Sequence, residues 1–103
     1  MGYPYIEPLL EDAVDPVTGS PKNVSECFDA TIQVVGIIAG DTVRIEGSNE
    51  KTPTVWSIIQ FEGSDDITAS GYYSLETLPT WIRAKLQADA GGGTVSVFMR
   101  AGR

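Results

Sequence analysis

Residues 41–56 read DTVRIEGSNEKTPTVW, and this stretch contains the pattern that decides the fold. Between Thr42 and Glu46, polar and apolar side chains alternate, which is typical of a β-strand with one face on a core and the other in water. The turn-forming residues Gly-Ser-Asn-Glu follow at 47–50, and an apolar run begins again at Val55. The stretch therefore predicts two neighbouring strands joined by a loop.

Short apolar runs of the same kind recur along the rest of the chain, with Gly, Asp and Asn turns between them. The predicted strands are residues 24–29, 31–38, 42–47, 55–61, 71–75, 81–88 and 94–100. In 95–99 the odd positions, and in 82–86 the even positions, are expected to face the core. This pattern predicts a single all-β domain, a β-sandwich or jelly roll of about seven to eight short antiparallel strands.

The N-terminal segment differs from the rest of the chain. Its prolines, Pro4, Pro8, Pro16 and Pro21, argue against a helix or an interior strand. We therefore predict an extended, Pro-rich, acidic arm over residues 1–23 and a sandwich domain over 24–103. The arm either docks on its own domain or reaches a neighbouring subunit. Its predicted partner-contact residues are the apolar ones, Tyr3, Tyr5, Ile6, Leu9 and Leu10.

Composition excludes several classes of function. A net charge of −7 argues against binding to nucleic acid or to an anionic membrane surface. The chain has no histidine, which rules out Ser/His/Asp and Cys/His catalysis, and its single cysteine rules out an internal disulfide. No run approaches the roughly 20 apolar residues of a membrane helix, and no signal peptide is evident. We expect no enzyme, no cofactor and no metal site.

Aromatic residues are the remaining candidates for recognition. Trp56 and Trp81, with Asn49, can stack on and hydrogen-bond a sugar, although tryptophans in a sandwich more often belong to the core. Of the pair Tyr72 and Tyr73, one ring is expected inside and one outside. Exposed rings at Tyr73 and Phe98 would fit a subunit interface. For Arg83 we expect a carboxylate partner such as Glu46.

These residues also form a pattern that resembles small virion proteins of tailed bacteriophages. The pattern consists of Val43-Arg44-Ile45-Glu46-Gly47-Ser48-Asn49, then Trp56, then Trp81-Ile82-Arg83, a Gly-rich turn at 91–94 and a basic end at 100–103. It covers residues 30–103 and leaves the arm unmatched. The chain departs from the pattern at Glu50-Lys51, where Asp-Gly is usual.

The same residues are similar to the second half of the discoidin domain, a jelly roll that binds sugars or lipid headgroups. That domain is longer and carries bridging cysteines that are missing here. The shared residues support jelly-roll topology more than ligand binding.

The first resemblance implies a phage structural protein located in the virion and made in the cytoplasm of the bacterial host. Its expected role is capsid decoration, as a cement protein that stabilises the head through its sandwich and arm, with a neck or tail component as a near variant. The expected partners are the major capsid protein or another virion protein, and further copies of the chain, with a trimer favoured. The alternative is a carbohydrate-binding module of the jelly-roll type, with Asn49, Trp56 and Trp81 as its ligand residues.

Overall fold

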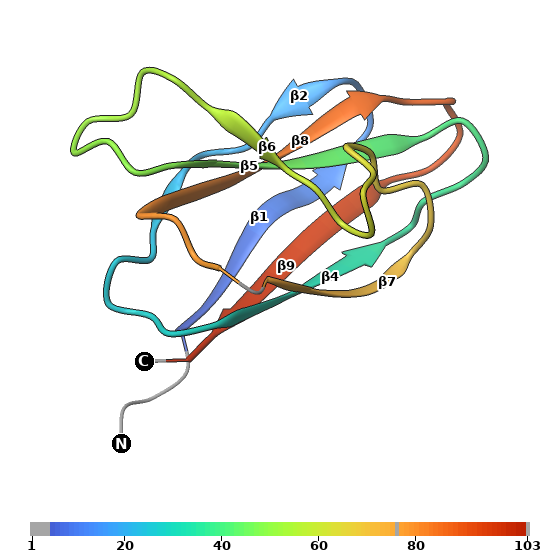
Figure 1. Ribbon diagram of the computed structural model, residues 1–103. Helices are drawn as coiled ribbons and strands as arrows, with labels where there is room; N and C mark the ends of the chain where they lie inside the picture. Colours follow the sequence, from blue (N-terminus) through green and yellow to red (C-terminus); the bar gives the residue numbers. More distant parts are fainter. Residues whose placement is uncertain (1–4, 76, 103) are drawn as a thin grey trace.

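The structure, a computed structural model, describes residues 5–75 and 77–102, and its regular elements are all β-strands (Figure 1). The strands are β1 Tyr5–Ala13, β2 Val17–Thr18, β3 Lys22–Asn23, β4 Ala30–Val35, β5 Thr42–Ser48, β6 Ser57–Ile59, β7 Gly71–Leu75, β8 Trp81–Ala88 and β9 Val95–Ala101. In these residues there is no helix with the length and apolar character needed to cross a membrane.

The strands form two antiparallel sheets that pack face to face as a β-sandwich (Figure 1). Sheet A has the order β1-β9-β4-β7, and sheet B has the order β2-β8-β5-β6, with β3 also paired to β8. Because β2 and β3 share one partner, they act as one interrupted strand. Neighbouring strands in each sheet then come alternately from the first and the second half of the chain. This is the strand order of a jelly roll. The predicted fold class is confirmed.

Alternation along the central strands builds the core between the sheets. Ile82, Ala84 and Leu86 of β8 are fully buried, as expected for the even positions. Along β9 the odd positions, Val95, Val97 and Met99, are buried to the same degree. Cross-strand neighbours complete the core, since β9 lies between β1 and β4, and β8 lies between β5 and the β2–β3 edge. Period-two patterning alone therefore placed the correct faces of these strands inward.

The segment expected to be a separate arm belongs to sheet A. Residues 5–13 are extended, as predicted, but they form β1, which pairs along β9 from Tyr5 opposite Ala101 to Ala13 opposite Val95. Pro8, which lies within β1, is tolerated because β1 is an edge strand, where one row of backbone groups needs no partner. Register shifts after Pro8 and after Leu10 mark bulges that disrupt this edge. The domain therefore begins before residue 24.

The strand predicted at residues 24–29 is wrong, because this segment forms a turn. The Asn23 side chain accepts hydrogen bonds from both the backbone N–H and the hydroxyl of Ser25. The Cys27 N–H then donates to the Val24 carbonyl at 2.9 Å. An Asn side chain that captures the backbone two residues on is a turn-former, and it competes with strand pairing here.

Gly19 lies between β2 and β3 at the edge of sheet B, where the backbone comes close to β1, and this close approach yields a prediction. Its N–H donates to the Ala84 carbonyl of β8, and a Cβ at this position would lie 2.0 Å from the Leu9 carbonyl oxygen of β1. Gly19→Ala should therefore destabilise the fold by about 1–3 kcal/mol, the usual cost of overpacking. Gly93→Ala is the matched control, because its Cβ would meet nothing within 4 Å. Urea unfolding measures both, and equal stabilities would contradict the tight contact.

Candidate functional site

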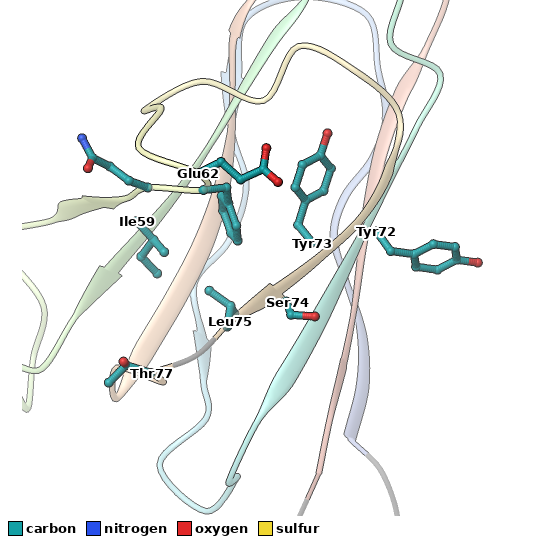
Figure 2. A pocket seen from close by; sticks show the side chains of 9 residues that line it. Ile59, Glu62, Tyr72, Tyr73, Ser74, Leu75 and Thr77 are labelled. Carbon is teal, nitrogen blue, oxygen red and sulfur yellow. The ribbon is translucent and has the colours of Figure 1, made fainter.

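A cleft of about 570 Å³ opens between β6 and β7, the strands that end the two sheets on one side of the sandwich (Figure 2). Because neither strand has a further neighbour in its sheet, the cleft lies where the two layers are not closed over each other. It is lined by Ile59, Gln60, Phe61, Glu62, Tyr72, Tyr73, Ser74, Leu75 and Thr77.

Aromatic packing shapes the floor of this cleft. The Phe61 and Tyr73 rings meet edge to face, with their centroids 5.4 Å apart, and the Tyr73 hydroxyl donates to the Ala69 carbonyl at 2.6 Å. Among the described lining residues, Glu62 is the one charged side chain. It is exposed, and its backbone has a positive φ of 54°. The cleft therefore combines packed aromatic rings with an exposed carboxylate.

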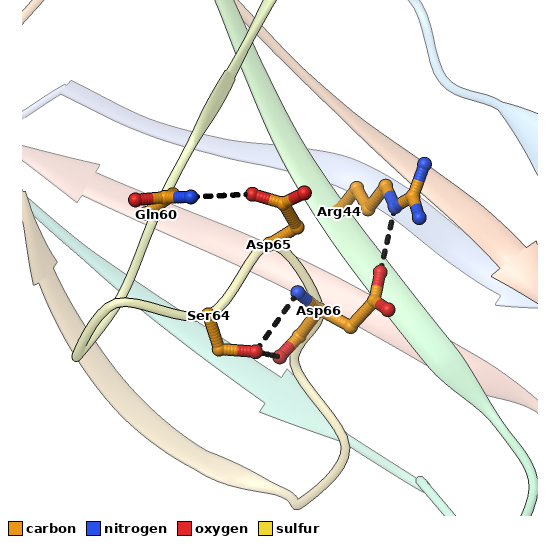
Figure 3. Close-up of polar contacts among 5 residues, drawn as sticks. All are labelled: Arg44, Gln60, Ser64, Asp65 and Asp66. Atoms are coloured by element: carbon orange, nitrogen blue, oxygen red, sulfur yellow. Dashed lines mark hydrogen bonds and ion pairs between the residues drawn. The ribbon is translucent and has the colours of Figure 1, made fainter.

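The loop that forms one wall of the cleft is attached to β5 by polar contacts (Figure 3). Arg44 Nε lies 2.6 Å from Asp66 Oδ1, and this hydrogen bond raises the pKa of Arg44. Gln60 donates to Asp65 Oδ1 at 2.7 Å, and the Ser64 hydroxyl bonds both backbone groups of Asp66. The two adjacent carboxylates thus turn to different partners. Within residues 5–75 and 77–102, no three potential metal-ligating side chains gather together.

A second cleft, of about 590 Å³, lies beside the β5–β6 loop, and Glu50 organises that loop. The Glu50 carboxylate accepts hydrogen bonds from the Val55 N–H at 2.6 Å and from the N–H and hydroxyl of Thr54. These contacts, with Val55 first, hold the pKa of Glu50 below its ordinary value. Asn49 is used structurally too, because its Oδ1 accepts from the Thr80 N–H at 2.9 Å.

The three residues expected to bind a sugar do not converge on one cleft. Asn49 lines the second cleft, whereas Trp56 and Trp81 are not among the described residues of its lining. The Arg83 guanidinium lies 4.1 Å from the centre of the Trp56 ring, so the chain's own cation occupies one face of that ring. Arg83 Nε also lies 2.8 Å from Glu46 Oε1. This is the carboxylate partner expected from the sequence, placed opposite Arg83 on β5.

The residues predicted for partner contact along the arm divide into three groups. Tyr3 lies outside the described residues. Leu9 and Leu10 are 2 % and 6 % exposed and belong to the core of their own domain, which corrects their assignment as partner contacts. Tyr5 is partly buried against that core, and Ile6 is 64 % exposed. The bulge after Pro8 lets consecutive leucines face the interior, which strict alternation would not allow.

The two residues expected at a subunit interface also differ in their surroundings. Phe98 is 37 % exposed on the outer face of sheet A. Tyr73 points toward the loop that carries Glu62 and packs on Phe61, whereas Tyr72 points to the other side of β7 and is 74 % exposed (Figure 2). The sequence indicates one ring in and one out, and pairing decides which. Because Tyr73 lies opposite the buried Ile32 of β4, Tyr72 is the outward ring.

Comparison with known proteins identifies a shared fold. No family model matches the sequence, and no curated protein matches it either. Among solved structures, the chain is similar to the crystal structure of the SPBc2 prophage-derived protein YomS, with a TM-score of 0.72 and 12% sequence identity. The similarity covers 98% of this chain and 96% of that chain. The whole jelly-roll domain, β1 included, therefore has the fold of a prophage-derived protein.

Proposed function

We propose that this chain is a structural protein of a phage particle. The observation that carries the proposal is the fold shared with the SPBc2 prophage-derived protein YomS over nearly the full length of both chains. The resemblance of residues 30–103 to small virion proteins of tailed phages, read from the residues alone, leads to the same proposal independently. A shared fold at 12% identity supports the proposal of a phage protein. It does not indicate where in the particle the chain lies, which an experiment has to determine.

The polar groups of the domain support an assembly role over a catalytic one. The charged side chains Asp41, Arg44 and Glu50 form short contacts that hold turns and loops in place. In the second cleft the Ser48 hydroxyl lies 3.4 Å from Glu50 Oε1, but that carboxylate also accepts hydrogen bonds from Thr54 and Val55 and so holds the loop. A rigid sandwich with loops held in this way presents surfaces that keep their shape, which is what a particle subunit requires.

Within the particle we assign the chain to capsid decoration, with a neck or tail component as the near variant. Its partner is then the major capsid protein or another virion protein. The exposed acidic residues Glu11 and Asp15, next to the exposed Val14, form a surface that fits a basic patch on such a partner. Binding through these charges should weaken as ionic strength rises, because exposed charges are screened by salt.

The test begins with particles of the phage that encodes this chain, purified on a density gradient and analysed by mass spectrometry. We expect the chain to remain with the particles, and antibody labelling in the electron microscope should place it on the head. If the protein is produced during infection but is missing from purified particles, the proposal is overturned.

A second experiment separates decoration from the other positions. Heads assembled without this protein should bind purified full-length chain at a fixed number of copies, and the loaded heads should resist heating better than bare heads. Glu11→Lys with Asp15→Lys should weaken this binding about 10-fold or more, whereas Lys51→Glu, in the exposed β5–β6 loop, is the matched control. Labelling confined to the tail or neck would move the assignment there.

A further inference from the structure

The outer face of sheet A carries four of the exposed large apolar side chains of the domain. Ile6, Val35, Tyr72 and Phe98 are 64%, 42%, 74% and 37% exposed. Pairing brings them to one surface, because Phe98 lies opposite Pro8 on one side and Gln33 on the other, and Gln33 lies opposite Tyr72. A groove of about 340 Å³ runs over this face between Ile6, Phe98 and Tyr72.

Side chains of opposite charge lie at the two ends of this face. Arg100, Phe98 and Ser96 follow one another at alternate positions of β9, so their side chains point outward together. Ile6 lies opposite Arg100 at one end. At the other end, the Ser96 hydroxyl accepts from the Asp12 N–H at 3.0 Å and lies 3.5 Å from Asp12 Oδ1. The face thus has a cation at one end, aromatic rings in the middle and a carboxylate at the other end, roughly 14 Å from the cation.

We propose that this face binds a second copy of the chain through a two-fold axis that lies in the interface and crosses β9 near Phe98. The axis reverses the strand direction, so Arg100 of each copy faces Asp12 of the other. Phe98 and Tyr72 then meet their own counterparts at the centre. Each pair of copies gains two opposite-charge contacts around an apolar centre, which is the self-complementarity that an isologous interface requires.

Charge selects this arrangement over the other two-fold packing of the same face. An axis parallel to the strands would place Arg100 against Arg100 and Asp12 against Asp12, which repel each other. The net charge of −7 on each copy opposes association, and salt weakens this repulsion because charges are screened beyond about 8 Å at physiological ionic strength. The described contacts leave Arg100 without an ion pair inside its own chain, so it is available to a second copy.

The size of the face indicates a weak association. Four strands about 4.8 Å apart and about seven residues long give a contact area roughly 19 Å by 24 Å. This is below the ~800 Å² per partner of a standard stable interface, so we expect a weak and reversible pair. The inference goes beyond the proposed function, because it concerns the isolated chain and holds or fails whether or not the protein is part of a phage particle.

Sedimentation velocity of the full chain from about 10 µM to 1 mM provides the first test. We expect the mass to approach twice that of the monomer as concentration rises. Phe98→Lys should weaken association at least 10-fold, because it places a cation at the centre of an apolar contact. Val55→Lys is the matched control, since Val55 is 69% exposed on the β5–β6 loop, away from this face. A monomer at 1 mM, a trimer, or equal weakening by the two variants would overturn the proposal.

Charge reversal tests the direction of the axis. Arg100→Asp and Asp12→Lys should each weaken association, whereas the chain carrying both changes should again pair with itself and should not pair with the wild type. Asp12 has a positive φ of 49°, so each variant is first checked for a cooperative thermal transition. Asp12→Asn, which tolerates this conformation, should weaken pairing even if the lysine variant is unstable. Self-association unaffected by Asp12→Asn and Arg100→Asp would overturn the proposed arrangement.

Discussion

A chain that lacks residues 1–13 is expected to be unfolded at 25 °C. The deletion removes β1, whose Leu9, Leu10 and Ala13 are 2%, 6% and 8% exposed in the core. Each leucine contributes about 1.5–3 kcal/mol by burial, and the deletion also leaves the outer row of β9 backbone groups unpaired. Losses of this size consume most of the 5–15 kcal/mol typical of a whole domain, taken as an order of magnitude.

Circular dichroism and urea unfolding measure this outcome. Deletion of residues 1–4 alone, which precede β1, is the matched control and should keep a cooperative transition. A single substitution gives a graded version, because Leu9→Ala should cost about 2–5 kcal/mol as a buried large-to-small change. If residues 14–103 alone unfold cooperatively with near-normal stability, β1 contributes little to the stability of the sandwich, and the prediction is wrong.

The second large effect is expected at Asp41, which holds two turns together at one end of the sandwich. One carboxylate oxygen accepts from the Ala90 N–H at 2.7 Å and the other from the Ile38 N–H at 3.0 Å. Asp41 is 2% exposed, and its loss would remove the partner that these two N–H groups have in the folded state. Asp41→Asn keeps the shape of the side chain, but its NH₂ group then faces one of these two N–H groups. Two donors cannot hydrogen-bond each other. We expect the melting temperature to fall by on the order of 10 °C.

The same site predicts a pH dependence. The N–H groups of Ala90 and Ile38 lower the pKa of Asp41 below its ordinary value, so the folded state binds its proton more weakly than the unfolded state does. The stability that the carboxylate contributes is therefore complete above about pH 5 and declines as the pH falls through about 4 and toward the lowered pKa.

Thermal unfolding of the wild type and of Asp41→Asn across pH 3–7 isolates this contribution. The difference between their melting temperatures should be largest at neutral pH and should shrink in acid, because the variant has no titrating group at this position. Asp15→Asn, which removes an exposed carboxylate that makes no contact with Asp41, is the comparison. A difference that stays constant with pH would mean that the contacts of Asp41 do not depend on its charge.

Periodicity in the sequence was sufficient for several of the strands. Residues 71–75 and 81–88 are strands with the bounds expected from the sequence, and the inward faces of β8 and β9 are as expected. The Arg83–Glu46 ion pair was also expected from the residue types. Pro8 argued against an interior strand but is compatible with an edge strand, and the sequence alone did not show that residues 5–13 form one.

The candidate recognition residues depended on pairing that no local pattern contains. The register of β7 against β4 placed Tyr72 outward and Tyr73 inward, and the approach of Arg83 to Trp56 removed one stacking face from the expected sugar-binding set. Asp41 resembles any turn aspartate in the sequence, because its partner Ala90 is 49 residues away. The charge polarity from Arg100 to Asp12 likewise arises only when β1 lies against β9.

The sequence by itself determined that the chain is an all-β sandwich and which faces of its central strands are buried, because alternation is a property of neighbouring residues. Tertiary structure alone decided that β1 belongs to the core, which aromatic rings are exposed, and that one face of sheet A combines an apolar centre with opposite charges at its ends. These features depend on strand register, which joins residues far apart in the chain and is set by the packing of the whole domain.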